Sequence, residues 1–445
     1  MSLGCRTPLG CQYEPPNPPR LSSMSDGIGL LLRRAGFGPT ASELTAAGQA
    51  GYQAALSALV VPAGPDVGAT SATVPDLGAD VYAGTRDLTY EEKVKLESLR
   101  NVQTEQLTEW WLDRMVVASH QAVEKMVFFW HGHWATSVKK VRSPQLMLKQ
   151  HRTLRNAADF TAMAREMVID AALNLYLDGH LNVKAAPNEN LARELFELFI
   201  LGIGQYTEKD IKEAGRALTG WRFSLTRGAS VFDPALHDRG RKTILGRTES
   251  FTAHSLIRLL LKQDACPRFI ASRLWYRYGS STTPIPEPLR EKMAEAFPAP
   301  MGMLRVLLAD EAFQATAGTL VKQPVEWLVG AMRQLGVRPS GLPAETRAAI
   351  LRDLDNLGQL PFAPPNVGGW PAGGAWLTSA AAQVRIRLAG RIADHVLVSS
   401  LTPESLAHLL CVQNWTNRTY AVLRGTQDRR QLLILGLVSP EYLVT

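Results

Sequence analysis

The 445-residue sequence has few cysteines and no apolar run long enough to cross a membrane. Its four cysteines, Cys5, Cys11, Cys266 and Cys411, form no CxxC pair. The first two lie in a proline-rich head and the other two in separate apolar stretches, so a disulfide framework is not expected. The N-terminus also lacks the basic-then-apolar order of a secretory signal, which favours a cytoplasmic location.

Sequence motifs of several common enzyme chemistries are also missing. There is no GxGxxG at a strand–helix junction, no GxxxxGK[ST], no GxSxG and no HExxH. Dinucleotide, P-loop and hydrolase-elbow chemistry are therefore unsupported. The net charge of +7, from 48 Lys+Arg against 41 Asp+Glu, is mild for this length. No basic run with interleaved aromatic residues is present, so we expect no nucleic-acid partner.

Most segments from Ile28 onward place apolar residues at helical spacing. Thr40 followed by Glu43, and Thr207 followed by Asp210, have the pattern of a capping box, in which a hydroxyl and a carboxyl group satisfy free amides at a helix N-terminus. The pattern therefore predicts a series of helices, two of which begin just after these threonines.

Strand-like patterns are concentrated in one stretch, residues 220–246, which predicts a small β-hairpin. We therefore predict an all-α fold, with one large multi-helix domain over residues 26–445 and the hairpin as an insertion. Residues 1–25 are rich in proline and are predicted to form a disordered tail. A start codon at Met24 would explain the same pattern, and both interpretations stay open.

The most unusual stretch is Trp130-His131-Gly132-His133-Trp134, in which two imidazoles flank one glycine. Histidine is the commonest metal ligand and titrates near neutral pH. An extended backbone at Gly132 would place both rings on one face, as a two-nitrogen clamp for a divalent metal or as an acid–base pair. In the alternative, one histidine caps the preceding helix and the other bonds to the backbone.

A second cluster of polar residues begins at Asn188. Glu189 and Arg193 are four residues apart, and Glu194 lies three residues before Glu197, so each pair shares a helix face. The same helix is apolar on several sides, so its carboxylates must be paired, bind a metal or shift in pKa. Ion pairing within the protein is the alternative to a role in catalysis.

Two loops supply further candidates. His237 and Asp238 lie near Lys242 on a glycine-containing loop, a composition found in anion or metal sites and also in ordinary polar loops. Trp370 lies in residues 361–371, which are rich in proline and glycine. This segment could form an aromatic wall for a flat ligand or a structural lock against helices.

Many short blocks of the sequence occur in an order that carries a family resemblance. These blocks are residues 31–38, 129–137, 176–179, 187–195, 217–221, 237–238, 242–246, 364–371 and 439–443. Taken together they resemble the bacterial family called domain of unknown function 1800, over nearly the whole chain from about Leu30.

The resemblance implies little about activity, because the family's name records that its biochemistry is not established. Members are often exported, and are frequently encoded beside a second uncharacterised family that looks like a sulfatase or phosphatase relative. The resemblance thus implies a partner protein from that sulfatase-like family and leaves a periplasmic location open. This sequence departs from exported members in having no export signal.

We predict an enzyme of hydrolase or lyase type that acts on a polar substrate, with a glycan as one candidate and a divalent metal as an optional cofactor. The expected catalytic residues are His131, His133, Glu194, His237 and Asp238, and the two residues His131 and His133 are also the candidate metal ligands. The expected substrate-binding residues are Asn188, Glu189, Arg193, Lys242 and Trp370. The alternative is a non-catalytic binding or assembly protein for a glycan or a protein partner.

Overall fold

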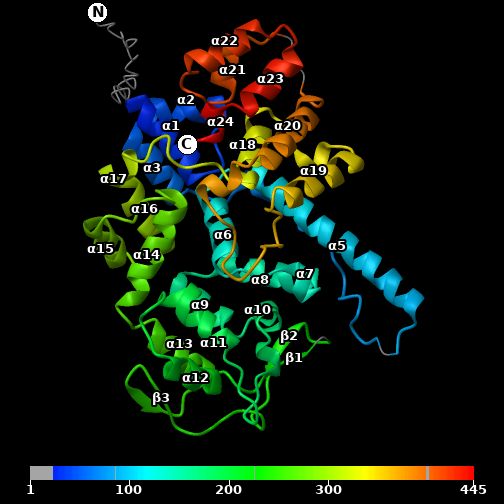
Figure 1. The fold of residues 1–445 in the computed structure, drawn as a ribbon, viewed down its shortest axis with the longest axis vertical. Coiled ribbons are helices and arrows are strands. Elements are labelled where there is room, and N and C mark those ends of the chain that lie inside the picture. The colour runs from blue at the N-terminus through cyan, green and yellow to red at the C-terminus, as the bar shows by residue number, and fades with distance from the viewer. Residues whose placement is uncertain (1–23, 86, 225, 397–399) are drawn as a thin grey trace, which may run out of the picture.

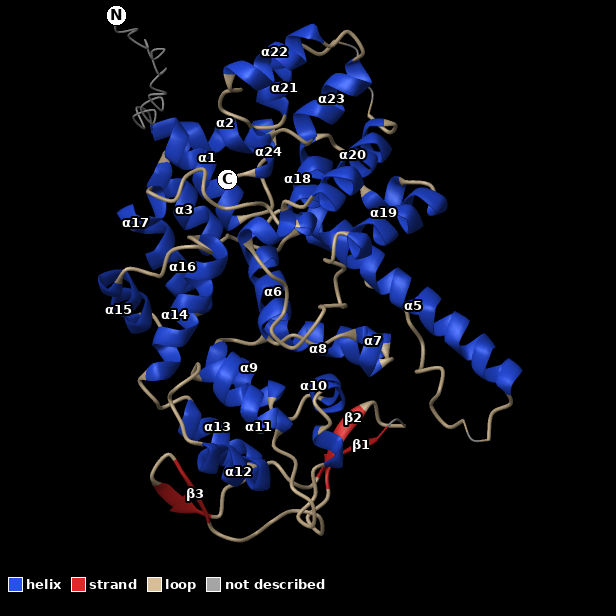
Figure 2. Ribbon diagram, in the orientation of Figure 1, coloured by secondary structure: helices blue, strands red, loops and turns tan. Residues whose placement is uncertain are grey.

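The computed structural model describes residues 24–445 except 86, 225 and 397–399, and helices dominate it (Figure 1, Figure 2). Cys5, Cys11 and most of the predicted tail lie outside the described residues, and the first helix begins at Met24. No helix in the described part of the chain is long and apolar enough to cross a membrane.

The helices follow one another along the whole described chain. The first are α1 (Met24–Ala35), α2 (Ala41–Ala50), α3 (Tyr52–Val60), α4 (Val67–Thr70), α5 (Tyr90–Val117), α6 (Gln121–His133), α7 (Val138–Val141) and α8 (Pro144–Asn156). The next are α9 (Phe160–Met167), α10 (Ala171–Tyr176), η1 (Gly179–Leu181), α11 (Asn190–Glu194), the π-helix η2 (Leu195–Ile200), α12 (Glu208–Ala217), α13 (Ala253–Leu260), α14 (Ala265–Tyr278), α15 (Glu287–Glu295) and α16 (Pro300–Ala309). The last are α17 (Glu311–Gln314), α18 (Pro324–Gln334), η3 (Pro339–Gly341), α19 (Ala344–Asn356), η4 (Gly373–Trp376), α20 (Ser379–Ala393), α21 (Pro403–Leu409), α22 (Asn417–Gly425), α23 (Arg429–Leu437) and α24 (Pro440–Leu443).

The strands form two small hairpins at one end of the molecule (Figure 2). Strand β1 (Trp221–Ser224) pairs antiparallel with β2 (Ala229–Phe232), and β3 (Lys242–Ile244) pairs antiparallel with β4 (Arg247–Glu249). The prediction of a mostly helical fold with a small β insertion is confirmed. Two hairpins are present where one was expected, and strand β4 of the second lies beyond the predicted range of 220–246.

Both predicted capping boxes are present. The Thr40 hydroxyl accepts from the Glu43 amide at the start of α2, and the Thr207 hydroxyl accepts from the Asp210 amide at the start of α12. In each case the acidic side chain bonds back to the amide of the threonine. Local hydrogen bonding between residues three apart in sequence therefore determines where these helices begin.

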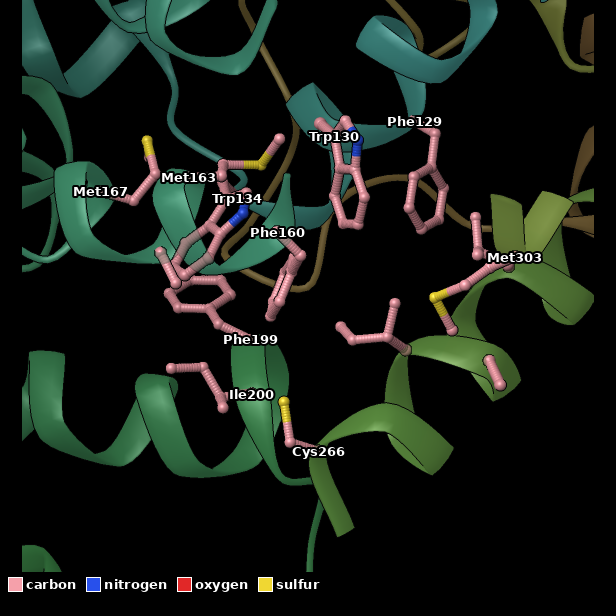
Figure 3. Close-up of a cluster of buried hydrophobic side chains, with 14 of the residues drawn as sticks. Phe129, Trp130, Trp134, Phe160, Met163, Met167, Phe199, Ile200, Cys266 and Met303 are labelled. Atoms are coloured by element: carbon pink, nitrogen blue, oxygen red, sulfur yellow. The ribbon is translucent and has the colours of Figure 1, made fainter. Parts of the chain in front are cut away.

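Helix α6 lies near the centre of the molecule (Figure 1). Phe129 and Trp130 pack into one cluster of buried apolar side chains, while Val127 and Phe128 pack into a second. Figure 3 shows the first cluster around Trp130, where side chains of other helices close over the ring. Most side chains of α6 are buried, including the polar residues Gln121, Glu124 and Lys125, and His131 and His133 are buried with them.

Candidate functional site

The α6 helix continues through the His-Gly-His stretch and ends at His133. The Trp134 amide donates to the Trp130 carbonyl oxygen at 2.8 Å, so the last turn is helical. The expectation of an extended backbone at Gly132 is therefore wrong. Residues two apart on a helix are separated by roughly 200° around its axis. His131 and His133 consequently face different neighbours.

His131 holds a loop in place. Its Nε2 accepts a hydrogen bond from the Phe362 amide at 3.0 Å, so the ring carries its proton on Nδ1. The ring lies among Trp111, Phe362 and Trp370, with centroid distances of 5.2–5.5 Å. Burial lowers the pKa of His131 to about 3, which keeps the ring neutral. These contacts fasten the loop that carries Trp370 onto α6.

His133 is also buried, but one of its ring nitrogens remains free. The Nε2–H donates to the Phe199 carbonyl oxygen of η2 at 2.9 Å, which leaves Nδ1 as an acceptor. That Nδ1 is buried and has no hydrogen-bond partner among the described residues. Burial, and then the charge of Arg273, lower the pKa of His133 to about 3. The ring is therefore neutral and presents an unused lone pair.

His133 lines a small cavity of about 40 Å³ between the end of α6, α14 and the loop around Trp370. This space is large enough for a few water molecules or one small polar group. The lining residues are Phe128, Phe129, Gly132, His133, Arg273, Tyr276, Arg277, Gln323, Gly368 and Trp370. The Nε1–H of Trp370 is buried and has no partner among the described residues.

The two arginines of this cavity are in different electrostatic situations. Arg277 forms an ion pair with Glu326 at 3.2 Å, and Lys125 forms another with the same carboxylate at 2.8 Å. Arg273 has neither a hydrogen bond nor an ion pair within the described ranges, and its Nε is buried. The guanidinium lies over the ring of Tyr276, 5.9 Å from its centroid, and its charge acts on His133. The cavity thus holds an uncompensated positive charge beside an unused acceptor.

Arg273 also lines a larger cleft of about 620 Å³ between η2 and α14, a volume typical of small-molecule sites. In this cleft Arg268 is bound by both carboxylate oxygens of Glu291, at 2.7 and 2.9 Å. Arg290 donates to Glu287 through Nη2, but its buried Nε has no partner in the described chain. Two carboxyl groups, Glu197 and Asp264, also line the cleft, and Glu197 is paired with Arg193. The unpaired donors of Arg273 and Arg290 favour an anionic ligand.

The Asn188 cluster forms a network of ion pairs at the start of α11. Arg193 binds Glu197 at 3.2 Å and Glu208 at 2.8 Å, and lies 3.7 Å from Glu189. The amide of Asn190 donates to the side chain of Asn188. These contacts correspond to the ion-pairing alternative.

Glu194 stands apart from the Asn188 network. Burial, and then the charge of Glu197, raise the pKa of this half-buried carboxyl group. Among the described residues, Arg193 forms ion pairs with Glu189, Glu197 and Glu208 and none with Glu194, although its charge partly offsets the rise in the Glu194 pKa.

The polar groups of the His237 cluster bond to neighbouring protein groups, including Arg216 of α12. His237 Nδ1 donates to the Thr219 carbonyl oxygen at 2.9 Å, and Asp238 accepts from Arg216 Nε at 2.7 Å. The buried Nζ of Lys242 donates to the carbonyl oxygens of Asp238 and Gly240. The structure therefore brings His131, His133 and Trp370 together. Glu197 of the Asn188 network borders the larger cleft, whereas the His237 cluster lines neither space.

The donor set does not fit a metal bound by His131 and His133. Each Nε2 is already bonded to backbone, and the rings face different neighbours. Within the described ranges, no three His, Cys, Asp or Glu side chains are grouped so that they could hold a metal ion. No reaction step here is therefore assigned to a metal.

The sequence pattern did not identify Arg273, which completes the cavity. Arg273 and Arg277 are four residues apart in α14, a spacing that places them on one helix face. Such a pair usually lies on a solvated surface, and nothing local shows that α14 packs against α6. The available signal was two arginines among the aromatic residues Phe269, Trp275 and Tyr276.

The comparisons with known proteins identify a family but no characterised relative. The model of the family described as "Protein of unknown function (DUF1800)" matches residues 30–444. No curated protein and no solved structure matches the chain.

Proposed function

We propose that this chain, which belongs to the DUF1800 family of proteins of unknown function, binds an acidic substrate that carries hydroxyl groups. The substrate occupies the cavity at His133 and the cleft that shares Arg273 with it. The reaction is of hydrolase or lyase type, with His133 as the base. The observation that carries this proposal is that one cavity contains two groups without partners among the described residues, the Nδ1 of His133 and the guanidinium of Arg273.

The ligand class follows from these two groups. An arginine without a carboxylate partner favours a carboxylate or another oxyanion. The neutral His133 Nδ1 can only accept a hydrogen bond, so it requires a hydroxyl group or a water molecule as donor. A hydroxylated organic acid, such as a sugar acid, supplies both groups on one molecule. The volume of the cleft suits a ligand of one or two sugar rings.

The bound acid would also adjust the chemistry of His133. Without a ligand, burial and the charge of Arg273 hold the pKa of His133 at about 3, which makes the ring a weak base. A carboxylate on Arg273 would offset that positive charge and raise the pKa of His133. The substrate's own charge would thus strengthen the base that takes a proton from its hydroxyl group or from a water molecule.

Calorimetric titration with glucuronate, and with glucose as the matched neutral sugar, tests the binding claim. We expect glucuronate to bind and glucose to bind at least about tenfold more weakly, because a charge-assisted hydrogen bond contributes ~1.5–3 kcal/mol. Arg273→Gln should weaken glucuronate binding by a similar factor. The control, Arg268→Gln, lies in the same cleft but removes an arginine already engaged by Glu291. Equal affinity of wild type and Arg273→Gln would contradict the proposal.

Turnover distinguishes an enzyme from the alternative binding protein. Release of reducing ends from uronate-containing oligosaccharides should be measurable for the wild type and lost in His133→Gln. The glutamine amide can still donate to the Phe199 carbonyl oxygen, while the Nδ1 acceptor is removed. Glucuronate binding without any turnover would support the binding protein and contradict the enzyme.

A further inference from the structure

The cavity at His133 is lined by cations and by no carboxylate. Arg273 and Arg277 are its charged lining residues, and no aspartate or glutamate is among the described residues that line it. Arg277 is paired with Glu326, which lies outside the lining and also binds Lys125. Arg273 thus offers a ligand a positive charge for which no carboxylate of the lining competes.

This composition separates two reaction classes that would both use His133 as a base. Hydrolysis of a glycosidic bond normally needs a pair of carboxyl groups that flank the bond. Elimination from a uronate instead needs a cation on the substrate carboxylate, because removal of the neighbouring proton builds negative charge on the carboxylate oxygens. The cavity supplies the cation and the base but not the carboxyl pair, so it favours elimination.

The size of the cavity limits which substrate atoms meet the base. A volume of about 40 Å³ admits a carboxylate group but not a sugar ring, so the ring must stay in the cleft of about 620 Å³. Arg273 lines both spaces. A carboxylate on Arg273 therefore brings the carbon that bears it, rather than the glycosidic carbon, nearest to the Nδ1 of His133.

A proton donor lies on the same helix as Arg273. Tyr276 lines the cavity one helical turn further along α14, and the Arg273 guanidinium lies 5.9 Å from the centroid of its ring. Tyr276 is 39% exposed, so a ligand can reach its side chain. Tyrosine is one of the side chains that enzymes use as a general acid. The cavity therefore contains a base, a cation and an acid.

We propose that the substrate is a polyuronate and the reaction a β-elimination, an inference that rests on the proposed function of the same site. The Nδ1 of His133 takes the proton from the carbon that bears the carboxylate, and the electrons of that C–H bond form a C=C bond to the next carbon. The C–O bond from that next carbon to the leaving sugar breaks, its electron pair goes to oxygen, and Tyr276 donates a proton to that oxygen. Arg273 stabilises the charge that develops on the carboxylate. A proton passed from His133 to Tyr276 through water restores both groups.

The hydrogen bonding of His133 suits this role. Its Nε2–H donates to the Phe199 carbonyl oxygen at 2.9 Å, so Nδ1 is the nitrogen left to take a proton. Before the reaction, the same lone pair can accept a hydrogen bond from a hydroxyl group or a water molecule. A carboxylate bound to Arg273 offsets the charge that weakens this base. Substrate binding thus activates the base.

The products formed from a glucuronate oligomer linked as in cellulose distinguish the two reactions. Elimination leaves a C=C bond conjugated with the carboxylate, which absorbs ultraviolet light, whereas hydrolysis adds a water molecule and creates no such bond. We expect the full chain to release reducing ends and ultraviolet-absorbing ends at equal rates. The glucose oligomer of the same length and linkage, which has no carboxylate, should give neither.

Each contrary result has a separate meaning. Reducing ends without the ultraviolet absorbance, in products whose mass includes an added water molecule, would overturn the elimination. That result would keep the proposed function and point to hydrolysis by Glu197 and Asp264, the carboxyl groups that line the cleft. No reducing ends would overturn both the elimination and the proposed catalysis.

Tyr276→Phe tests the proton donor. It removes only the hydroxyl group, so kcat should fall by about 100-fold or more, the contribution of a general acid, while KM stays nearly unchanged. The matched control is Tyr278→Phe, which removes a hydroxyl group from the same helix. That hydroxyl group is buried, has no hydrogen-bond partner in the described chain, and belongs to a residue outside the cavity lining. Its loss should leave kcat unchanged, and equal kcat values for the two variants would overturn the proposed mechanism.

Discussion

The carboxylate of Glu326 is shared by two buried cations, Lys125 at 2.8 Å and Arg277 at 3.2 Å. Burial tends to raise the pKa of Glu326, but the charges of Arg277 and Lys125 outweigh burial and lower it to about 2. Removing one member of a buried ion pair leaves the other charge without compensation. Glu326 therefore holds Arg277, which lines the His133 cavity.

We predict that Glu326→Gln lowers the free energy of unfolding at pH 7 by roughly 3–5 kcal/mol. A carboxyl group whose pKa is lowered on folding stabilises the protein above its unfolded pKa, and that contribution is lost as the pH falls toward the folded pKa. Between about pH 4.5 and pH 2, the free energy of unfolding should therefore fall less steeply in the variant than in the wild type. Urea unfolding at several pH values measures both effects.

Glu208→Gln is the matched control for this prediction, because Glu208 pairs with Arg193 in an exposed network. Its effect should be much smaller than that of Glu326→Gln, since water screens exposed ion pairs. Similar effects of the two substitutions would contradict the structural role given to Glu326.

At the scale of elements, the loop between α19 and α20 is pressed onto the end of α6. Gly369 has a positive φ of 82°, and a Cβ atom there would collide with the carbonyl oxygen of Gly132. The Phe362 amide of the same loop bonds to His131. Since Gly368 and Trp370 line the cavity, this close approach keeps the cavity small.

We predict that Gly369→Ala destabilises the protein by about 2–5 kcal/mol, because both the left-handed backbone and the close contact oppose a side chain. It should also weaken glucuronate binding, since Trp370 would move. Gly374→Ala, in the same loop, is the control, because a Cβ atom there meets nothing within 4 Å. Thermal unfolding measures the difference, and equal melting temperatures for the two variants would contradict the predicted packing.

Local patterns predicted some elements better than others. The capping boxes at Thr40 and Thr207 involve residues three apart, so the sequence alone located those helix starts. The helix through Gly132 was missed because glycine weakens a helical pattern, whereas packing against Trp370 stabilises the helix in the fold. Tertiary contacts thus determine the backbone conformation at Gly132, where the local sequence signal is weakest.

At the scale of the whole molecule, the candidate site depends on which distant segments meet. The unusual pattern around His131 and His133 pointed to one part of the cavity, and Trp370, expected separately to bind substrate, lines the same cavity. Arg273 could not be recognised, because only the packing of α14 against the end of α6 gives it a role. The Asn188 and His237 clusters resembled sites because their ion-pair partners are not apparent from the local sequence. The fold supplies these partners, for example Arg216 for Asp238.

The central claim is that His133 is neutral, protonated on Nε2, and free at Nδ1 to receive a ligand. Nitrogen-15 NMR of histidine-labelled protein, with His133→Gln to assign the signal, tests this directly. We predict an Nε2–H tautomer that stays neutral from about pH 5 to pH 8, consistent with a pKa of about 3, and an Nδ1 signal that shifts when glucuronate is added. An Nδ1–H tautomer, or an Nδ1 signal unchanged by glucuronate at saturating concentration, would contradict the claim.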